Sequence, residues 1–375
     1  MLLLTLIGIL SYLSKGLFGF TEMLYIGIAC GFVLFLLMVL ARPVPKILAY
    51  YIIIAIIGTS FILINNGLAA GKFYLPIVIS SIGIALAIKR TINSNIKFHL
   101  YLSAFIFWVL VLFFFIYFTQ YGNFDGAIAA SRNHVSVNLI LPSCYYVIAR
   151  RFNGIGIPVH YPFIVVAISA MAVGTSGILV SLLIFIGYFL DKGIKIATFI
   201  FVCVVIAYFT IDWTHVLSLI DDDLLRKIIY KLEYGDIRED IVKVYIEKLD
   251  FLRLVIGAPL EQTSWNIVGR RGEVISSSNL HNSYLLLHVK IGILSFVFVF
   301  GLMVVLIKLI KKDILVFFLF LAIIVRASTD TIAFSHGYHE WALLLVLLYA
   351  VDSNNIDKVN LLVRGANLSR IKKGK

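Results

Sequence analysis

Long apolar stretches separated by short polar connections make up most of this chain. A helix of about 20 apolar residues crosses the hydrocarbon core of a bilayer, and these stretches are continuous rather than alternating as in a membrane β-barrel. The pattern predicts an all-α polytopic membrane protein with about twelve transmembrane helices. We place the spans at Leu2–Phe18, Met23–Ala41, Ile47–Ile64, Phe73–Ile88, Phe98–Thr119, Val135–Ala149, Ile157–Val173, Ile178–Leu190, Ile196–Ile211, Tyr284–Ile307, Ile314–Val325 and Trp341–Val351.

The composition agrees with this class, because hydrophobic residues make up 61% of the 375 residues and charged residues only 14%. A soluble chain is roughly half apolar and about a quarter charged. We therefore exclude a water-soluble enzyme, a disordered protein and a secreted disulfide scaffold. Cys30, Cys144 and Cys203 lie inside apolar stretches without metal-ligand spacing, so we interpret them as small apolar residues.

Basic residues alternate between the two ends of the predicted spans. Every second connection is basic, with Arg42 and Lys46, Lys89, Arg90 and Lys97, Arg150 and Arg151, Lys192 and Lys195, and Lys308, Lys311 and Lys312. Because basic residues of short loops stay in the cytoplasm, we expect both termini to be cytoplasmic. The formal charge of +12 includes a basic tail that is expected to face anionic membrane lipid, so we expect no nucleic-acid partner.

A long polar segment interrupts the pattern at residues 212–283. It divides the chain into residues 1–211 with spans one to nine, the segment itself, residues 284–351 with spans ten to twelve, and a basic cytoplasmic tail at residues 352–375. The topology puts the segment on the outer face as one large helical loop. Apolar stripes predict two amphipathic helices lying on the membrane surface, one through residues 224–232 and one that begins at Asp236 with the apolar face Ile237, Ile241, Val244, Tyr245 and Leu249.

Three polar clusters lie where outer-face helices are expected to begin. They are Ser131-Arg132-Asn133-His134, Asp236-Ile237-Arg238-Glu239 and His281-Asn282-Ser283-Tyr284. Helix N-termini attract anions through unpaired N–H groups, and an arginine grips a phosphate with two parallel hydrogen bonds. Arg132 and Arg238 therefore suit a lipid diphosphate at the membrane surface, although an interfacial arginine without function is an open alternative for Arg132.

Further polar residues mark the tenth span and its surroundings. His281, Tyr284 and His288 share one helical face, which is typical of a face toward a cavity or another helix, and Lys290 lies nearly opposite. Arg270 and Arg271 form either a substrate contact or a solvated pair. Arg326 has either a functional role or an ion pair with Asp330 four residues on. We interpret Asp221-Asp222-Asp223 as a helix cap or a run of solvated charges. His336, His339 and Glu340 lack a fourth ligand for zinc, so we predict no metal site.

The order of these motifs resembles the O-antigen polymerase and ligase superfamily. The residues that carry the resemblance are Ser131-Arg132-Asn133-His134, Arg238 at a helix start, Gly257-Ala258-Pro259, His281-Asn282-Ser283-Tyr284-Leu285 and Gly292. The resemblance covers roughly Phe118 to Phe300 together with the span count. Many members carry Ser-Arg between the seventh and eighth spans, where this chain has Thr175-Ser176-Gly177. That departure puts a diphosphate role for this connection in doubt.

The resemblance implies a GT-C-like glycosyltransferase in the bacterial inner membrane. Such proteins transfer a glycan from undecaprenyl diphosphate to a hydroxyl of a second glycan on the outer face, without metal or cofactor. His281 matches the motif histidine that binds or deprotonates the acceptor, and Arg132 and Arg238 match arginines that hold the diphosphate. Asn282, Tyr284, His288, Arg270, Arg271 and Arg326 are further candidates for substrate binding. A separate chain-length regulator protein is an expected partner.

The resemblance favours a polymerase of O-antigen or capsule, which adds lipid-linked repeat units to one another. A ligase that transfers the glycan to lipid A core, or an O-linked protein glycosyltransferase, shares the same reaction and differs in its acceptor. A polysaccharide flippase is the alternative from another class. The long outer loop and the absence of an internal repeat disfavour the flippase, because transporters often contain paired repeats with broken helices.

Overall fold

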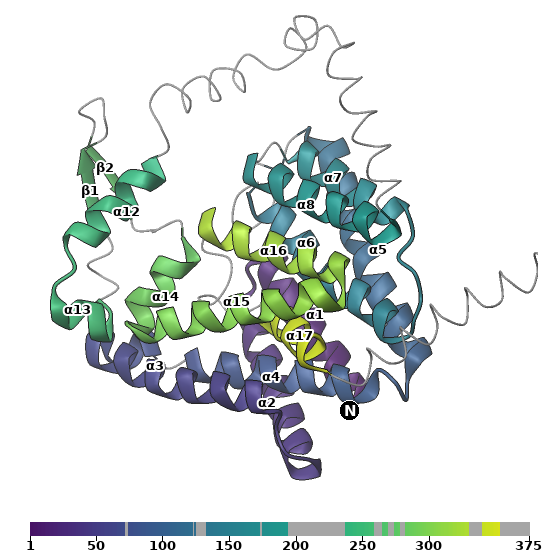
Figure 1. Cartoon of the computed structure of the whole chain (residues 1–375), viewed down its shortest axis with the longest axis horizontal. Helices are drawn as coiled ribbons and strands as arrows, with labels where there is room; N and C mark the ends of the chain where they lie inside the picture. The colour runs from purple at the N-terminus through teal and green to yellow at the C-terminus, as the bar shows by residue number, and fades with distance from the viewer. Residues whose placement is uncertain are drawn as a thin grey trace, which may run out of the picture.

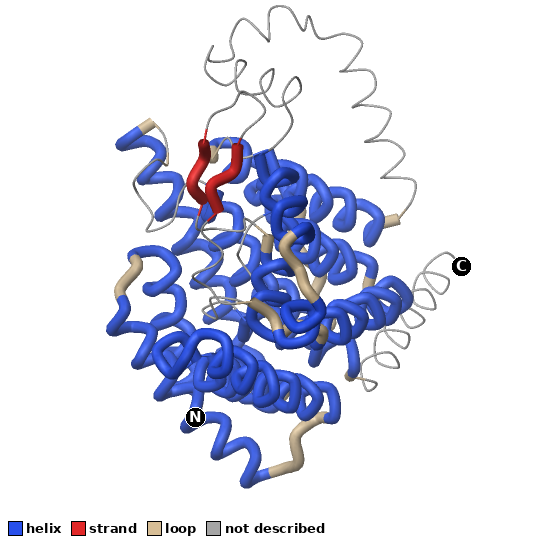
Figure 2. The backbone as a smooth tube through the Cα atoms, turned by 90° about the vertical axis from the view of Figure 1, so that its left-hand side faces the viewer, coloured by secondary structure: helices blue, strands red, loops and turns tan. Residues whose placement is uncertain are grey.

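The computed structural model describes residues 1–71, 74–122, 124, 133–172, 175–193, 237–258, 265–268, 274–277, 282–329 and 340–352. Within these residues the chain forms fourteen helices and one small antiparallel sheet (Figures 1 and 2). The fold is therefore all-α in its main body, as the pattern of apolar stretches predicts.

The first eight helices reproduce the first eight predicted spans with shifts of a few residues. They are α1 (Leu2–Phe18), α2 (Thr21–Ala41), α3 (Lys46–Gly71), α4 (Tyr74–Thr91), α5 (Ile96–Tyr121), α6 (Asn133–Phe152), α7 (His160–Met171) and α8 (Thr175–Lys192). The ninth predicted span, at residues 196–211, lies outside the described residues.

Five helices are long and apolar enough to cross a membrane. They are α2, α3 over Lys46–Asn65, α4, α5 and the later helix α15 (Leu294–Lys312), which places the chain among multi-pass membrane proteins. α1, α7, α16 (Ile314–Thr329) and α17 (Glu340–Val351) are shorter apolar helices. Large apolar side chains such as Leu40, Tyr101 and Phe300 point outward and are 70% exposed or more, which is the surface that lipid tails would cover.

The tenth predicted span, Tyr284–Ile307, is wrong as a single helix. It consists of α14 (Ser283–Ile291) and α15, which are separated at Gly292. Gly292 has φ 52°, a left-handed conformation that favours glycine. The Gly292 nitrogen caps α14 through the carbonyl of His288, and the next nitrogen, of Ile293, bonds the carbonyl of Val255 at 3.0 Å. The break therefore lets a segment of the loop dock against the bundle.

The basic connections that the charge pattern assigns to one side do lie together. Arg151 at the end of α6 forms ion pairs with Asp191 of α8 at 2.5 Å and with Asp313, between α15 and α16, at 3.0 Å. Lys89 near the end of α4 pairs with Asp352 after α17 at 3.5 Å. These ion pairs involve the ends of α4, α6, α8 and α17 and the connection between α15 and α16, and Tyr349 of α17 links the two groups by donating a hydrogen bond to Asp313 at 2.9 Å. Their common side agrees with the charge pattern.

The core is centred on α17, which is enclosed from Glu340 to Ala350. Close helix contacts around it depend on small residues. A Cβ at Gly83 of α4 would lie 2.0 Å from the carbonyl oxygen of Gly31 in α2, so only glycine permits this approach. Small residues thus bring the backbones of membrane helices together where apolar burial alone supplies little attraction.

The later part of the polar loop is folded and lies at one end of the long helices α3 and α15 (Figure 1). It contains α12 (Ile237–Glu247), α13 (Phe251–Ile256) and the strands β1 (Trp265–Val268) and β2 (Val274–Ser277), which pair antiparallel with Trp265 opposite Ser277. The sequence predicted helix α12 but not the two strands. The first predicted loop helix, through residues 224–232, lies outside the described residues.

The apolar face of α12 packs against α14, whereas the sequence predicted that this face lies on the membrane surface. Ile241 and Tyr245 from its apolar face are 1% and 2% exposed, and they form a small apolar cluster with Val289 of α14. The apolar stripe is therefore buried by another helix of the same chain. An amphipathic pattern indicates that one face is buried, but it does not indicate what buries it.

Candidate functional site

The start of α14 is fixed by a side-chain cap and by a tie to α16. Oδ1 of Asn282 accepts hydrogen bonds from the backbone nitrogens of Tyr284 at 2.9 Å and Leu285 at 3.2 Å, as an N-cap residue does. The hydroxyl of Tyr284 donates to the carbonyl of Ile324 in α16 at 2.8 Å. His281 immediately precedes this cap, so the residue expected to act on the acceptor is next to a fixed helix start.

The same contact brings Arg326 close to the start of α14. Arg326 follows Ile324 by two residues, is 2% exposed, and its Nη1 donates to Oγ1 of Thr329 at 2.8 Å. A buried arginine in a membrane protein is costly and is typical of a functional position. Asp330, its other predicted partner, lies outside the described residues. The two alternatives for Arg326 therefore both stay open.

His288 connects α14 to the loop helices α12 and α13, whereas Tyr284 connects α14 to α16. Its Nδ1 lies 2.7 Å from the hydroxyl of Tyr245 in α12, and its Nε2 lies 3.1 Å from the carbonyl of Leu254 in α13. Because a carbonyl only accepts, Nε2 donates, and in the neutral ring Nδ1 accepts from Tyr245. Burial raises the pKa of Tyr245, with Arg253 offsetting part of this effect, so the phenol stays protonated and donates.

Gly257 allows the loop backbone to lie directly on α14. Its φ is 86°, and a Cβ there would lie 2.2 Å from the carbonyl oxygen of Val289. The next nitrogen, of Ala258, bonds that same carbonyl at 3.0 Å. Asn65 of α3 adds a further tie, since its Nδ2 donates to the carbonyl of Ile256 at 2.8 Å. Gly257 and Ala258 thus hold the loop segment against α14.

The starts of α6 and α8 meet at the same end of the bundle. A Cβ at Gly177 would lie 2.9 Å from Oγ of Ser136, so these two helices approach closely just after their first turns. Nδ2 of Asn138 in α6 donates to the carbonyl of Gly16 near the end of α1 at 3.3 Å. Arg132 directly precedes α6, and the Thr175-Ser176-Gly177 connection begins α8. Two connections that the family resemblance singles out are therefore neighbours.

A second polar centre lies deeper, around Glu340 at the start of α17. Glu340 is 4% exposed, and its Oε2 has no hydrogen-bond partner among the described residues. The carboxylate interacts electrostatically with Lys290 of α14, and Nζ of Lys290 lies 5.8 Å from the ring centre of Tyr74. The sequence placed Lys290 opposite the histidines but did not connect it with Glu340, because the two residues are far apart along the chain.

The structure describes part of the predicted site. Asn282, Tyr284, His288 and Arg326 are described, and the polar atoms named above are used in contacts within the chain. Arg238 lies in α12, but its side chain is outside the description, and so are Arg132, Arg270, Arg271 and His281. The predicted common face of Tyr284 and His288 divides in practice, because one side chain contacts α16 and the other contacts α12 and α13.

The described elements thus converge at one end of the bundle. α12 carries Arg238, α14 directly follows His281, α16 carries Arg326, and α6 directly follows Arg132. By their place in the sequence, Arg132 and His281 precede helix starts and Arg238 is the second residue of α12, which are positions that suit an anionic group, whereas Arg326 lies in the last turn of α16. Comparison with known protein families, curated proteins and solved structures gives no match for this chain.

Proposed function

We propose that the protein is a surface-polysaccharide polymerase, of O-antigen or capsule, in the bacterial inner membrane. It transfers a glycan from undecaprenyl diphosphate to a hydroxyl of another lipid-linked repeat unit. The observation that carries the proposal is the packing of α12 and α16 against α14. This packing joins the helices that bear Arg238 and Arg326 to the helix that His281 precedes, and this closeness supports a common site for the three residues.

The proposed topology has about twelve spans in a GT-C-like arrangement with both termini in the cytoplasm. Residues 212–283 then lie on the outer face between spans nine and ten. The support for this sidedness is the common side of the ion-paired helix ends, which leaves α12, α13 and the start of α14 at the opposite end. Nucleotide sugars of the cytoplasm do not reach that end, which suits a lipid-linked donor.

In the proposed reaction the acceptor hydroxyl oxygen attacks the anomeric carbon of the donor glycan. The bond from that carbon to the diphosphate oxygen breaks, and the electron pair leaves with the lipid diphosphate. His281 takes the proton of the attacking hydroxyl, since a histidine pKa suits proton transfer near neutral pH. Arg132 and Arg238 stabilise the charge that develops on the diphosphate, with no metal required in this scheme.

The test is a polysaccharide gel from host cells that lack this gene and are complemented with variants. We expect the wild-type protein to restore a ladder of long chains. His281→Ala or Arg238→Ala should leave only single repeats on the acceptor, because loss of one charge-stabilising or proton-accepting group costs on the order of 10²-fold or more in rate. His160→Ala and Lys243→Ala serve as matched controls, since both side chains are exposed and lie outside the proposed site.

The other outcomes separate the alternatives. Long lipid-linked polymer that never reaches lipid A core would indicate a ligase. Repeat units retained on the cytoplasmic side of the membrane would indicate a flippase. A normal ladder from both His281→Ala and Arg238→Ala, with each protein present in the membrane at wild-type level, would overturn the polymerase assignment of these residues.

A further inference from the structure

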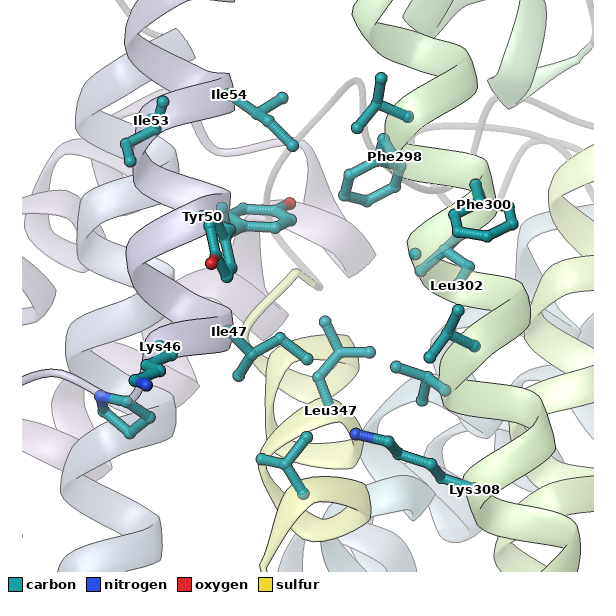
Figure 3. Close-up of a pocket in the computed structure, with 17 residues that line it drawn as sticks. Lys46, Ile47, Tyr50, Ile53, Ile54, Phe298, Phe300, Leu302, Lys308 and Leu347 are labelled. Carbon is teal, nitrogen blue, oxygen red and sulfur yellow. The ribbon is translucent and has the colours of Figure 1, made fainter.

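An apolar groove runs along the outside of the bundle between α3 and α15, with part of α17 as its floor (Figure 3). Its volume is about 830 Å³, and its walls include Tyr50 and Phe300, which are 66% and 70% exposed. Both walls are candidate membrane spans, so the groove faces the hydrocarbon of the bilayer. A long apolar chain is the kind of ligand that such a surface accepts.

One end of the groove carries two cations, one from each wall. Lys46 begins α3 and Lys308 lies near the end of α15, and both line the groove. Neither forms an ion pair with a described carboxylate. In Figure 3 Lys308 extends toward Leu347 on the floor of the groove, with Lys46 on the opposite wall. Both lysines belong to the basic connections that the charge pattern assigns to the cytoplasmic side.

We propose that this groove binds an anionic phospholipid of the cytoplasmic leaflet. One acyl chain lies along α3 and α15, and the phosphate sits between Lys46 and Lys308. A lipid supplies both features at once, because its apolar chain covers the exposed side chains and its phosphate pairs with the lysines at headgroup level. The inference is independent of the proposed glycan transfer, which would occur at the other end of the bundle.

Gly301 offers a way to fill the groove without disturbing the fold. It lines the groove on α15, and a Cβ built there meets nothing within 4 Å. Gly301→Phe should therefore occupy the space of the acyl chain. Met303→Phe adds a similar ring to the same helix at an exposed position outside the groove lining, so it is the matched control.

The experiment is native mass spectrometry of the full-length protein in mild detergent with dioleoyl phosphatidylglycerol or dioleoyl phosphatidylcholine. We expect the wild-type protein to retain phosphatidylglycerol preferentially. Lys46→Gln and Lys308→Gln should each lower its retention about five-fold, which is the effect of one cation at an anionic membrane surface. Gly301→Phe should lower the retention of both lipids. Lys311→Gln, exposed near the same helix end, and Met303→Phe should leave retention unchanged.

Several results would overturn the proposal. Equal retention of the two lipids by the wild-type protein would show that the two lysines do not select an anionic headgroup. If Lys311→Gln lowered phosphatidylglycerol retention as much as Lys46→Gln and Lys308→Gln do, general surface charge and not the groove would explain the preference. A dimer that Gly301→Phe dissociates, with lipid retention unchanged, would show that a second copy of the chain occupies the groove. Size-exclusion profiles of each variant establish that the folded protein is compared throughout.

Discussion

At the scale of single residues, Glu340 and Lys290 show how a charge is kept inside this bundle. Glu340 is enclosed at the start of α17, and the ammonium group of Lys290 interacts with its carboxylate from α14. An isolated charge in such surroundings costs several kcal/mol, and a charged partner offsets much of that cost. The ring centre of Tyr74 lies 5.8 Å from Nζ of Lys290, so an aromatic face adds to the surroundings of this ammonium group.

Removing one charge of this pair is expected to destabilise the protein more than removing both. Lys290→Met or Glu340→Gln alone should each lower the free energy of unfolding, and the loss from Lys290→Met should reach about 3 kcal/mol, because an unpaired buried carboxylate remains. The double variant should recover a measurable part of that loss. Thermal unfolding in detergent measures the cycle, with the exposed Lys311→Met as control. Strictly additive losses would show that the two charges are not coupled.

At the scale of elements, the break between α14 and α15 decides how the loop meets the bundle. A continuous span would keep the residues around Gly292 in helical hydrogen bonds. Instead, Val289 and Ile293 bond the backbone of the segment that includes Val255 and Ala258. The ring of His288 adds a contact to α12 and another to α13. The short segment from His288 to Ile293 therefore holds both loop helices.

Gly292→Ala tests this junction. A side chain is strained at φ 52°, and its Cβ would lie 2.1 Å from the carbonyl oxygen of Val255, so the loop segment has to shift. We expect a loss of at least 1 to 2 kcal/mol from the left-handed backbone alone, as an order of magnitude. Limited proteolysis should cut the α12–α13 region faster in this variant. Gly301→Ala, where a Cβ meets open space, should behave as wild type, and an uncleaved Gly292→Ala loop would contradict the assigned role.

The apolar pattern predicted the helices well because each span has to satisfy its own backbone in lipid. It placed α1 at the observed bounds and indicated α12 from the stripe of Ile241 and Tyr245. It missed the break at Gly292, since glycine inside an apolar stretch is tolerated in many membrane helices. It also missed β1 and β2, whose four-residue lengths give too few alternations to detect.

The sequence predicted which residues belong to the candidate site better than it predicted the contacts that they make. Short polar motifs at expected helix starts identified Arg132, Arg238 and His281 as residues to examine, and an intramembrane charge identified Arg326, since charges are rare in such a chain. The contact of Tyr284 with Ile324 and that of His288 with Tyr245 depend on neighbours that are distant in sequence. The Lys290–Glu340 interaction has the same origin, because only the packing of α14 against the centre of the bundle brings the two groups together.

At the scale of the whole molecule, the alternation of charged connections defines two ends of the bundle. Arg151, Asp191 and Asp313 meet at one end, together with Lys89 and Asp352. The folded loop elements α12 and α13 lie at the other end, next to the far end of α3 through Asn65. The proposed reaction requires the second end to face outward, because the lipid-linked glycan is presented there, so the sidedness of the chain is a direct condition of the proposed function.

Cysteine labelling measures this sidedness. In a background with Cys30, Cys144 and Cys203 replaced by alanine, single cysteines are placed at three exposed positions: Asn93 between α4 and α5, Gln120 at the far end of α5, and Lys243 on α12. A membrane-impermeant maleimide should label Gln120→Cys and Lys243→Cys in intact spheroplasts, but Asn93→Cys only after permeabilisation. The physical reason is the rule that basic connections stay in the cytoplasm, which assigns Asn93 to the inner side beside Lys89 and Lys97. The reverse pattern would place the loop in the cytoplasm and remove the proposed site from its lipid-linked donor, whereas labelling of Asn93 and Gln120 from one side would show that α5 does not cross the membrane.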